Sequence, residues 1–159
     1  MIYFLGTSFA AHHLKAAAHK RGVPVTENLT NADLVFVSED TSVAQDGARD
    51  LAPIYSLIDV AKATGAPIVL TSQVPPGFTR SLNIKDIWHQ AETLRVKDAE
   101  HRAMNPEQII VGGAKAITDV YADYLVSFDC PIIRVSWETA EFSKMAINAH
   151  LAMQVDTAN

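Results

Sequence analysis

A stretch near the end of the chain, residues 137–155, carries three side chains whose types and spacing could do chemistry. Glu141, Lys144 and Asn148 recur at steps of three and four residues, so on a helix a carboxylate, an ammonium and an amide fall on one face. A fixed ammonium and a fixed amide donor can together stabilise an oxyanion. The alternative is a solvated helix face, in which a Glu141–Lys144 pair contributes roughly 0.2–0.5 kcal/mol.

Two loops upstream carry further candidate groups. Val74-Pro75-Pro76-Gly77 follows the apolar run at 66–72, and such a turn at the end of a parallel strand forms a rigid loop with exposed N–H groups. Glu92 follows the apolar run at 87–91. The loop could equally be a plain connection to the next helix, and Glu92 an ordinary surface carboxylate.

The start of the chain has the order of a dinucleotide-binding turn. Residues 2–5 form an apolar strand, and Ser8 caps an alanine-rich helix that reaches about residue 21. The fingerprint G-x-G-x-x-G/A falls on Gly6, Ser8 and Ala11, with serine at its middle position. Helix N-termini attract phosphate even so, and NAD binding at this turn is therefore left open.

The carboxylate that would hold the ribose of such a cofactor has one candidate. Glu27 stands 21 residues after Gly6, about where that carboxylate belongs. The competing interpretation is a polar turn over 27–33, because this stretch is rich in residues that favour turns and caps.

The elements that must position these groups alternate between strands and helices. Strands are expected near 2–6, 34–38, 67–72, 87–91, 108–112 and 131–136, and helices near 8–21, 53–64, 114–127 and 138–159. Because the strand runs are continuously apolar, the pattern predicts a three-layer α/β, Rossmann-like domain with a mostly parallel sheet. Residues 1–137 would form this domain, and 138–159 a C-terminal helix.

Four motifs in this order resemble the UDP-glucose/GDP-mannose 6-dehydrogenase family: Val74-Pro75-Pro76-Gly77, Glu92-Leu94-Arg95, Ile109-Ile110-Val111-Gly112 and Glu141-Lys144-Asn148. The resemblance implies an NAD-binding domain followed by the start of a central helix. It implies catalytic positions at Glu92, which would position a hydrolytic water, and at Lys144 and Asn148, which would stabilise an oxyanion. It implies cofactor-binding positions at Gly6, Ser8, Ala11, Glu27, Thr41, Gln73, Pro76 and Gly77.

The chain also departs from that family. About one βα unit is missing before the strand at 34–38, on the side of the adenosine. The family's catalytic cysteine follows the central helix, whereas the one cysteine here is Cys130, outside that motif. We therefore expect NAD binding to be weak or absent, and the chain to be incomplete for oxidising a nucleotide sugar. A standalone, non-catalytic binding or assembly domain is the alternative.

Composition excludes several other classes. A net charge of -5 with scattered basic residues argues against nucleic-acid binding, and the sequence has no apolar run of about 18 residues that could span a membrane. A single cysteine is consistent with a reducing, cytoplasmic location, and no metal site is expected.

Phe142, Met145, Ala149 and Met153 form an apolar stripe, so a homodimer through 138–159 is expected. A nucleotide-sugar ligand is expected only in a full-length context.

Overall fold

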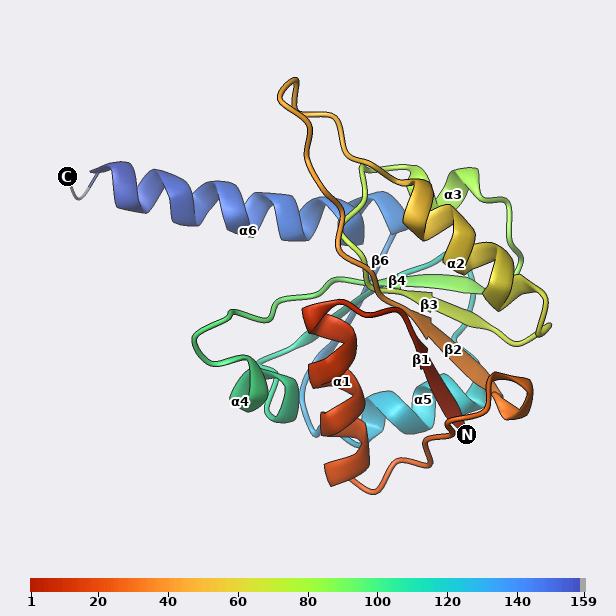
Figure 1. The fold of residues 1–159 in the computed structure, drawn as a ribbon. Helices are drawn as coiled ribbons and strands as arrows, with labels where there is room; N and C mark the ends of the chain where they lie inside the picture. Colours follow the sequence, from red (N-terminus) through yellow and green to blue (C-terminus); the bar gives the residue numbers. More distant parts are fainter. Residues whose placement is uncertain (158–159) are drawn as a thin grey trace.

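A computed structural model describes residues 1–157, without the side chains of 148, 150–152 and 154–157. All six predicted strands are present, at the bounds β1 (Ile2–Leu5), β2 (Leu34–Val37), β3 (Ile68–Leu70), β4 (Ile87–Gln90), β5 (Ile109–Gly112) and β6 (Ile132–Val135). They form one sheet in the order β1-β2-β3-β4-β5-β6, with helices on both faces (Figure 1). The predicted α/β class and three layers are confirmed.

The sheet is mostly parallel, with one reversal. β1 to β4 run in the same direction, β5 is antiparallel to β4, and β6 is parallel to β5. At the reversal His89 pairs with Gly112. Because β6 runs against β4, the helix that follows β6 begins beside the amino end of β4, where the Trp137 indole donates to the carbonyl of Ile87.

The helices are α1 (Phe9–Lys20), α2 (Ala52–Lys62), α3 (Phe78–Ser81), α4 (Ala99–Met104), α5 (Asp119–Val126) and α6 (Trp137–Thr157). The helix predicted over 114–127 was wrong at its start, because Thr118 is the extended residue that precedes the first turn of α5. α4 was not predicted. The far end of α6 extends beyond the rest of the molecule (Figure 1), and no helix in the described part is both long and apolar enough to cross a bilayer.

Each face of the sheet buries its own core. One core gathers β-strand aromatics with α1 and α5, where the Phe36 ring lies 4.8 Å from that of Tyr124. The other packs Val35, Val37 and Leu70 against α2 and α3. Each large side chain buried in this way contributes about 1.5–3 kcal/mol, so both layers hold the sheet in place.

The chain changes direction beside β1. After α1, Val25 forms a single parallel bridge with Ile2 on the outer side of β1. A short 3-10 helix, Leu29–Asn31, then leads to β2 on the other side of β1. Ligands of open α/β sheets bind where the connections diverge in this way, at the carboxyl ends of the strands. The candidate ligand site is therefore at the carboxyl ends of β1 and β2.

Candidate functional site: a polar cleft at the carboxyl ends of the strands

A polar cleft of about 330 Å³ lies at these strand ends. Its lining comes from the start of α1, the ends of β2 and β3, and the segment after β4: Ser8, Ala10, Ser38, Glu39, Asp40, Thr41, Arg49, Thr71, Ser72, Gln73 and Glu92. Four of the predicted site residues, Ser8, Thr41, Gln73 and Glu92, thus share one cleft.

Glu92 and Lys144, predicted as catalytic positions, form an ion pair. The Lys144 ammonium lies 3.1 Å from a Glu92 carboxylate oxygen, and both side chains are less than a fifth exposed. The other oxygen of Glu92 accepts the N–H of Leu94. Lys144 is thus paired across the fold rather than with Glu141 on a solvated face. The side chain of Asn148 lies outside the described residues.

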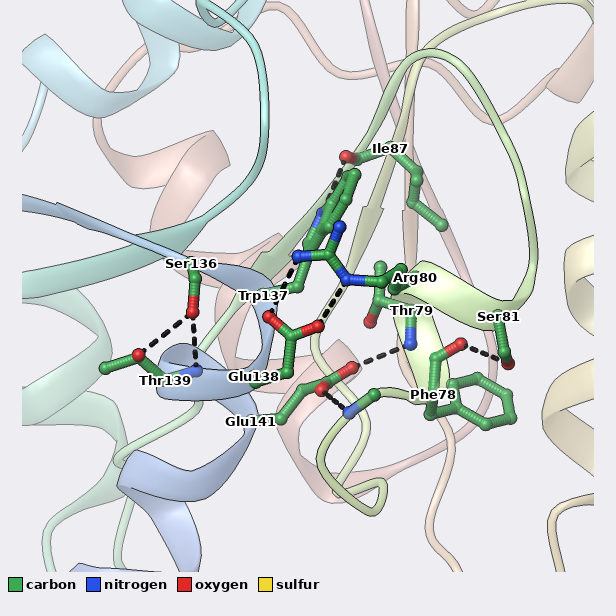
Figure 2. Close-up of polar contacts among 11 residues, drawn as sticks. Phe78, Thr79, Arg80, Ser81, Ile87, Ser136, Trp137, Glu138, Thr139 and Glu141 are labelled. Carbon is green, nitrogen blue, oxygen red and sulfur yellow. Dashed lines mark hydrogen bonds and ion pairs between the residues drawn. The ribbon is translucent and has the colours of Figure 1, made fainter.

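Glu141 has a different partner, and it changes the expected role of the Pro-Pro-Gly loop. Its buried carboxylate accepts the N–H of Gly77 at 2.5 Å and that of Thr79 at 2.7 Å. Figure 2 shows it reaching from α6 towards the start of α3. The prediction that this loop exposes free N–H groups was wrong at Gly77, because the Gly77 N–H already donates to Glu141. Pro76 is exposed and lies outside the cleft lining.

A second contact, which was not predicted from the sequence, joins the same two helices. Arg80 pairs with Glu138, and the guanidinium also lies 4.9 Å from the centre of the Trp137 ring (Figure 2). The hydrogen bond from Arg80 lowers the pKa of Glu138 to about 2. This exposed pair and buried Glu141 both tie α6 to α3, and so fix the helix that carries Lys144.

The first turn has the close approach that a dinucleotide fold needs, but a different polar network. A Cβ on Gly6 would lie 1.9 Å from the Ser38 carbonyl oxygen, and its φ is +119°, so only glycine fits. The Ser8 hydroxyl accepts the N–H of Ala11 and lies 2.8 Å from that of Ser38. Ser8 is therefore a buried helix cap whose side chain is turned into the protein.

The remaining predicted cofactor positions are held by contacts within the chain. Glu27 pairs with Lys15 at 2.7 Å, near the end of the Val25 bridge. The Thr41 hydroxyl donates to the carbonyl of Gln73 at 3.1 Å and accepts from Arg49 at 2.8 Å. Ala11 lines a smaller hollow of about 230 Å³ beside the first turn, with Gly6 and Lys15.

Glu39, which sequence reasoning missed, also meets the first turn. Its carboxylate accepts the backbone N–H of Thr7 at 2.9 Å and the Thr7 hydroxyl at 3.2 Å. The only sequence signal is an acidic residue at the tip of a buried strand. The backbone of this turn has the close approach that a dinucleotide-binding turn needs. The Glu39 carboxylate, however, lies beside the N–H groups that would meet the diphosphate.

Other reactive groups lie away from the cleft. Cys130 lies between α5 and β6, half-buried against the core, and burial raises the pKa of its thiol. Such a cysteine is a packing residue rather than a nucleophile. No cluster of three or more metal-ligating side chains occurs among the residues that the structure describes.

Comparison with known proteins finds both sequence relatives and structural neighbours. No family model matches the chain. UDP-glucose 6-dehydrogenase 1 of Arabidopsis thaliana is 30% identical over 167 residues, covering 85% of this chain and 33% of the relative. The enzyme of Pseudomonas aeruginosa is 25% identical over 179 residues, covering 96% and 38%. This chain is a relative of the UDP-glucose/GDP-mannose dehydrogenases. It spans about a third of the length of these curated dehydrogenases.

Solved structures of nucleotide-sugar dehydrogenases share the fold. The GDP-mannose dehydrogenase of Pseudomonas aeruginosa, in a ternary complex, superposes with a TM-score of 0.75 at 21% identity, over 96% of this chain and 41% of that one. The UDP-D-ManNAc dehydrogenase of Pyrococcus horikoshii gives 0.78 at 15% identity, over 93% and 50%. An uncharacterized protein of Methanocaldococcus jannaschii, MJ1054, is 29% identical over 82% of this chain and 17% of its own length.

Proposed function

We propose that this chain is the NAD-binding domain of a nucleotide-sugar dehydrogenase, and that Glu92 and Lys144 belong to its oxidation site. The observation that carries the proposal is their ion pair. Two motifs 52 residues apart in the sequence meet at 3.1 Å, beside a cleft at the carboxyl ends of the strands. Sequence relatives that are UDP-glucose 6-dehydrogenases support it.

The two side chains suit complementary roles. The Lys144 ammonium offers a fixed positive charge to an oxyanion that develops during acyl transfer. The Glu92 carboxylate, held by the Leu94 N–H, can orient a water for hydrolysis. Bound NAD would supply the hydride acceptor. In the absence of substrate each group neutralises the other, so the partly buried charges are not left unpaired.

These 159 residues carry no nucleophile for the covalent step of such an oxidation, because Cys130 is packed against the core. We expect no NADH from UDP-glucose or GDP-mannose at any cofactor concentration, and no change in Cys130→Ser. NADH absorbance measures both. Sustained NADH formation that Cys130→Ser abolishes would contradict this assignment.

The affinity of the chain for NAD⁺ directly tests the proposed role of the domain. We expect a dissociation constant weaker than about 100 μM, because Ser8 is turned inward and Glu27 is already paired. Isothermal titration with NAD⁺ measures it. A low micromolar constant would show that the turn suffices as it stands.

A non-catalytic binding or assembly domain is the second candidate. It is favoured by the Glu39 carboxylate at the first turn and by the absence of a reactive cysteine from the sequence. Titration separates the two, because this candidate predicts no heat from NAD⁺ even at millimolar concentration. For either candidate we propose a cytoplasmic location, supported by the single cysteine.

A further inference from the structure

The carboxylate of Glu39 makes an unusual set of contacts at the start of α1. One of its oxygens lies 2.9 Å from the backbone nitrogen of Thr7, and both lie 3.2 Å from the Thr7 hydroxyl. The oxygen that accepts the Thr7 N–H, Oε2, would also lie 3.4 Å from a Cβ on Gly6. Glu39 comes from the tip of β2, 32 residues away in the sequence. A strand-end side chain thus reaches across the crevice to the glycine turn of its neighbour.

This is the place where an open α/β sheet receives the diphosphate of a dinucleotide. β1 and β2 lie at the change of direction, because Val25 bridges the outer side of β1 and β2 pairs with its inner side. Diphosphates bind there through backbone N–H groups at the start of the helix. Within the described part of the chain, the N–H groups of Phe9 and Ala10 have no hydrogen-bond acceptor. Donors for an anion therefore remain beside the one that Glu39 occupies.

We propose that Glu39 is an internal anion of the dinucleotide turn, which competes with the cofactor's diphosphate for Thr7 and repels it by its charge. This inference rests on the proposed function, since it concerns the same cofactor. A diphosphate brought to the free N–H groups would meet a like charge within the same turn, and like charges in contact oppose binding. Glu39 then determines which ligands the cleft accepts, and disfavours those with a diphosphate.

The rest of the cleft does not offset that repulsion. Its lining contains two further carboxylates, Asp40 and Glu92, against the single guanidinium of Arg49. The Lys144 ammonium is paired with Glu92, and Arg49 is bonded to Thr41. Among the acidic groups, Glu39 alone accepts from the turn itself, which makes it the group whose removal should matter most.

The test compares Glu39→Gln and Glu39→Ala with wild-type protein, with Asp40→Asn as the matched control. Asp40 is the next residue, lines the same cleft and is exposed. Isothermal titration uses two probes, NAD⁺ and inorganic pyrophosphate. We expect both Glu39 variants to bind both probes at least about 10-fold more tightly than wild type, and Asp40→Asn to gain less than about 3-fold. Circular dichroism checks that each variant is folded.

The outcomes separate this inference from the proposed function. Tighter pyrophosphate binding without a gain for NAD⁺ would support the role of Glu39 and count against an NAD-binding domain. Equal affinities of wild type and both Glu39 variants would overturn the inference, including the case in which wild type already binds NAD⁺. An equal gain in Asp40→Asn would overturn it too, because the effect would then be general charge. The inference would also be overturned if no variant bound pyrophosphate at millimolar concentration.

Discussion

The Glu92–Lys144 pair is costly to break because both charged groups are largely withdrawn from solvent. Each side chain is less than a fifth exposed, so removing one leaves the other partly buried and unpaired. We expect Glu92→Gln and Lys144→Met each to lower the free energy of unfolding by about 1–2 kcal/mol. The double variant should lose less than the sum, with a coupling of about 1 kcal/mol. Urea denaturation measures all three.

Lys62→Met provides the control for that cycle. The Lys62–Asp59 pair is 3.8 Å long and well exposed on both sides, so its loss should cost less than about 0.5 kcal/mol. Additive effects of Glu92→Gln and Lys144→Met would show that the two charges do not interact in solution.

His89 gives the fold a pH dependence. It is buried, and burial lowers its pKa to about 3 from 6.5. Between these values the unfolded chain binds a proton that the folded chain does not, so the free energy of unfolding falls as the pH is lowered. The contribution is about 5 kcal/mol at most by pH 3.

Replacing His89 by glutamine, which does not titrate, should flatten that decline. Chemical denaturation of wild type and His89→Gln from pH 7 to about 3.5 measures the difference in slope. Parallel curves would contradict a neutral, buried imidazole. The carboxylates titrate in both proteins, so they cancel in the comparison.

At the scale of single residues, the sequence indicated candidate side chains better than it indicated their contacts. Glu92 and Lys144 were found because each falls in a motif with characteristic spacing. Glu39 was not, because an acidic residue after a strand has no signature until the neighbouring strand is known. Glu141 was found on the expected face, but its partner on α3 depends on how α6 crosses the sheet.

At the scale of elements, Glu141 joins α6 to the loop before α3. In Glu141→Ala the part-buried N–H of Gly77 and the buried N–H of Thr79 would lose their acceptor, so we expect the free energy of unfolding to fall by about 2–4 kcal/mol. Hydrogen exchange at these two amides should become faster. Glu138→Gln is the control, because Glu138 also joins α6 to α3 but is more exposed and accepts neither amide. Protected amides in Glu141→Ala would contradict the tether.

The strands were predictable because six continuous apolar runs can be buried only in a sheet covered on both faces. Their direction was not, since an apolar run reads the same in either orientation, and β5 reverses. The start of α5 was missed because residues 114–118 contain good helix formers, and only the extended conformation of Thr118 ends that run. A single bridge at Val25 lies before β2, where the resemblance predicted that about one βα unit is missing.

At the scale of the whole molecule, the apolar side chains of α6 have to be considered together. Phe142 is 55% exposed and Met145 is 38% exposed. Burying about 600 Å² of such surface would contribute roughly 15 kcal/mol, before an association cost of about 4–15 kcal/mol. We propose a homodimer through residues 138–159, because a two-fold contact covers the same stripe on both copies.

Sedimentation velocity at tens of micromolar tests the dimer. We expect wild type to sediment as a dimer and Met145→Asp as a monomer. Val126→Asp is the control, because Val126 is also apolar and is more exposed than Met145 but lies on α5. This variant should leave the dimer intact. A wild-type monomer, or a dimer in Met145→Asp, would remove the proposal.

The attachment of α6 makes it a lever. Its first two turns are fixed to α3 through Glu138 and Glu141 and to the segment after β4 through Lys144. At 1.5 Å per residue, the 13 residues beyond Lys144 reach about 20 Å outward. A tilt of α6 by about 10° about these contacts would move its far end by roughly 3 Å. A force on the outer part of α6 would therefore be borne by the contacts of Glu138, Glu141 and Lys144.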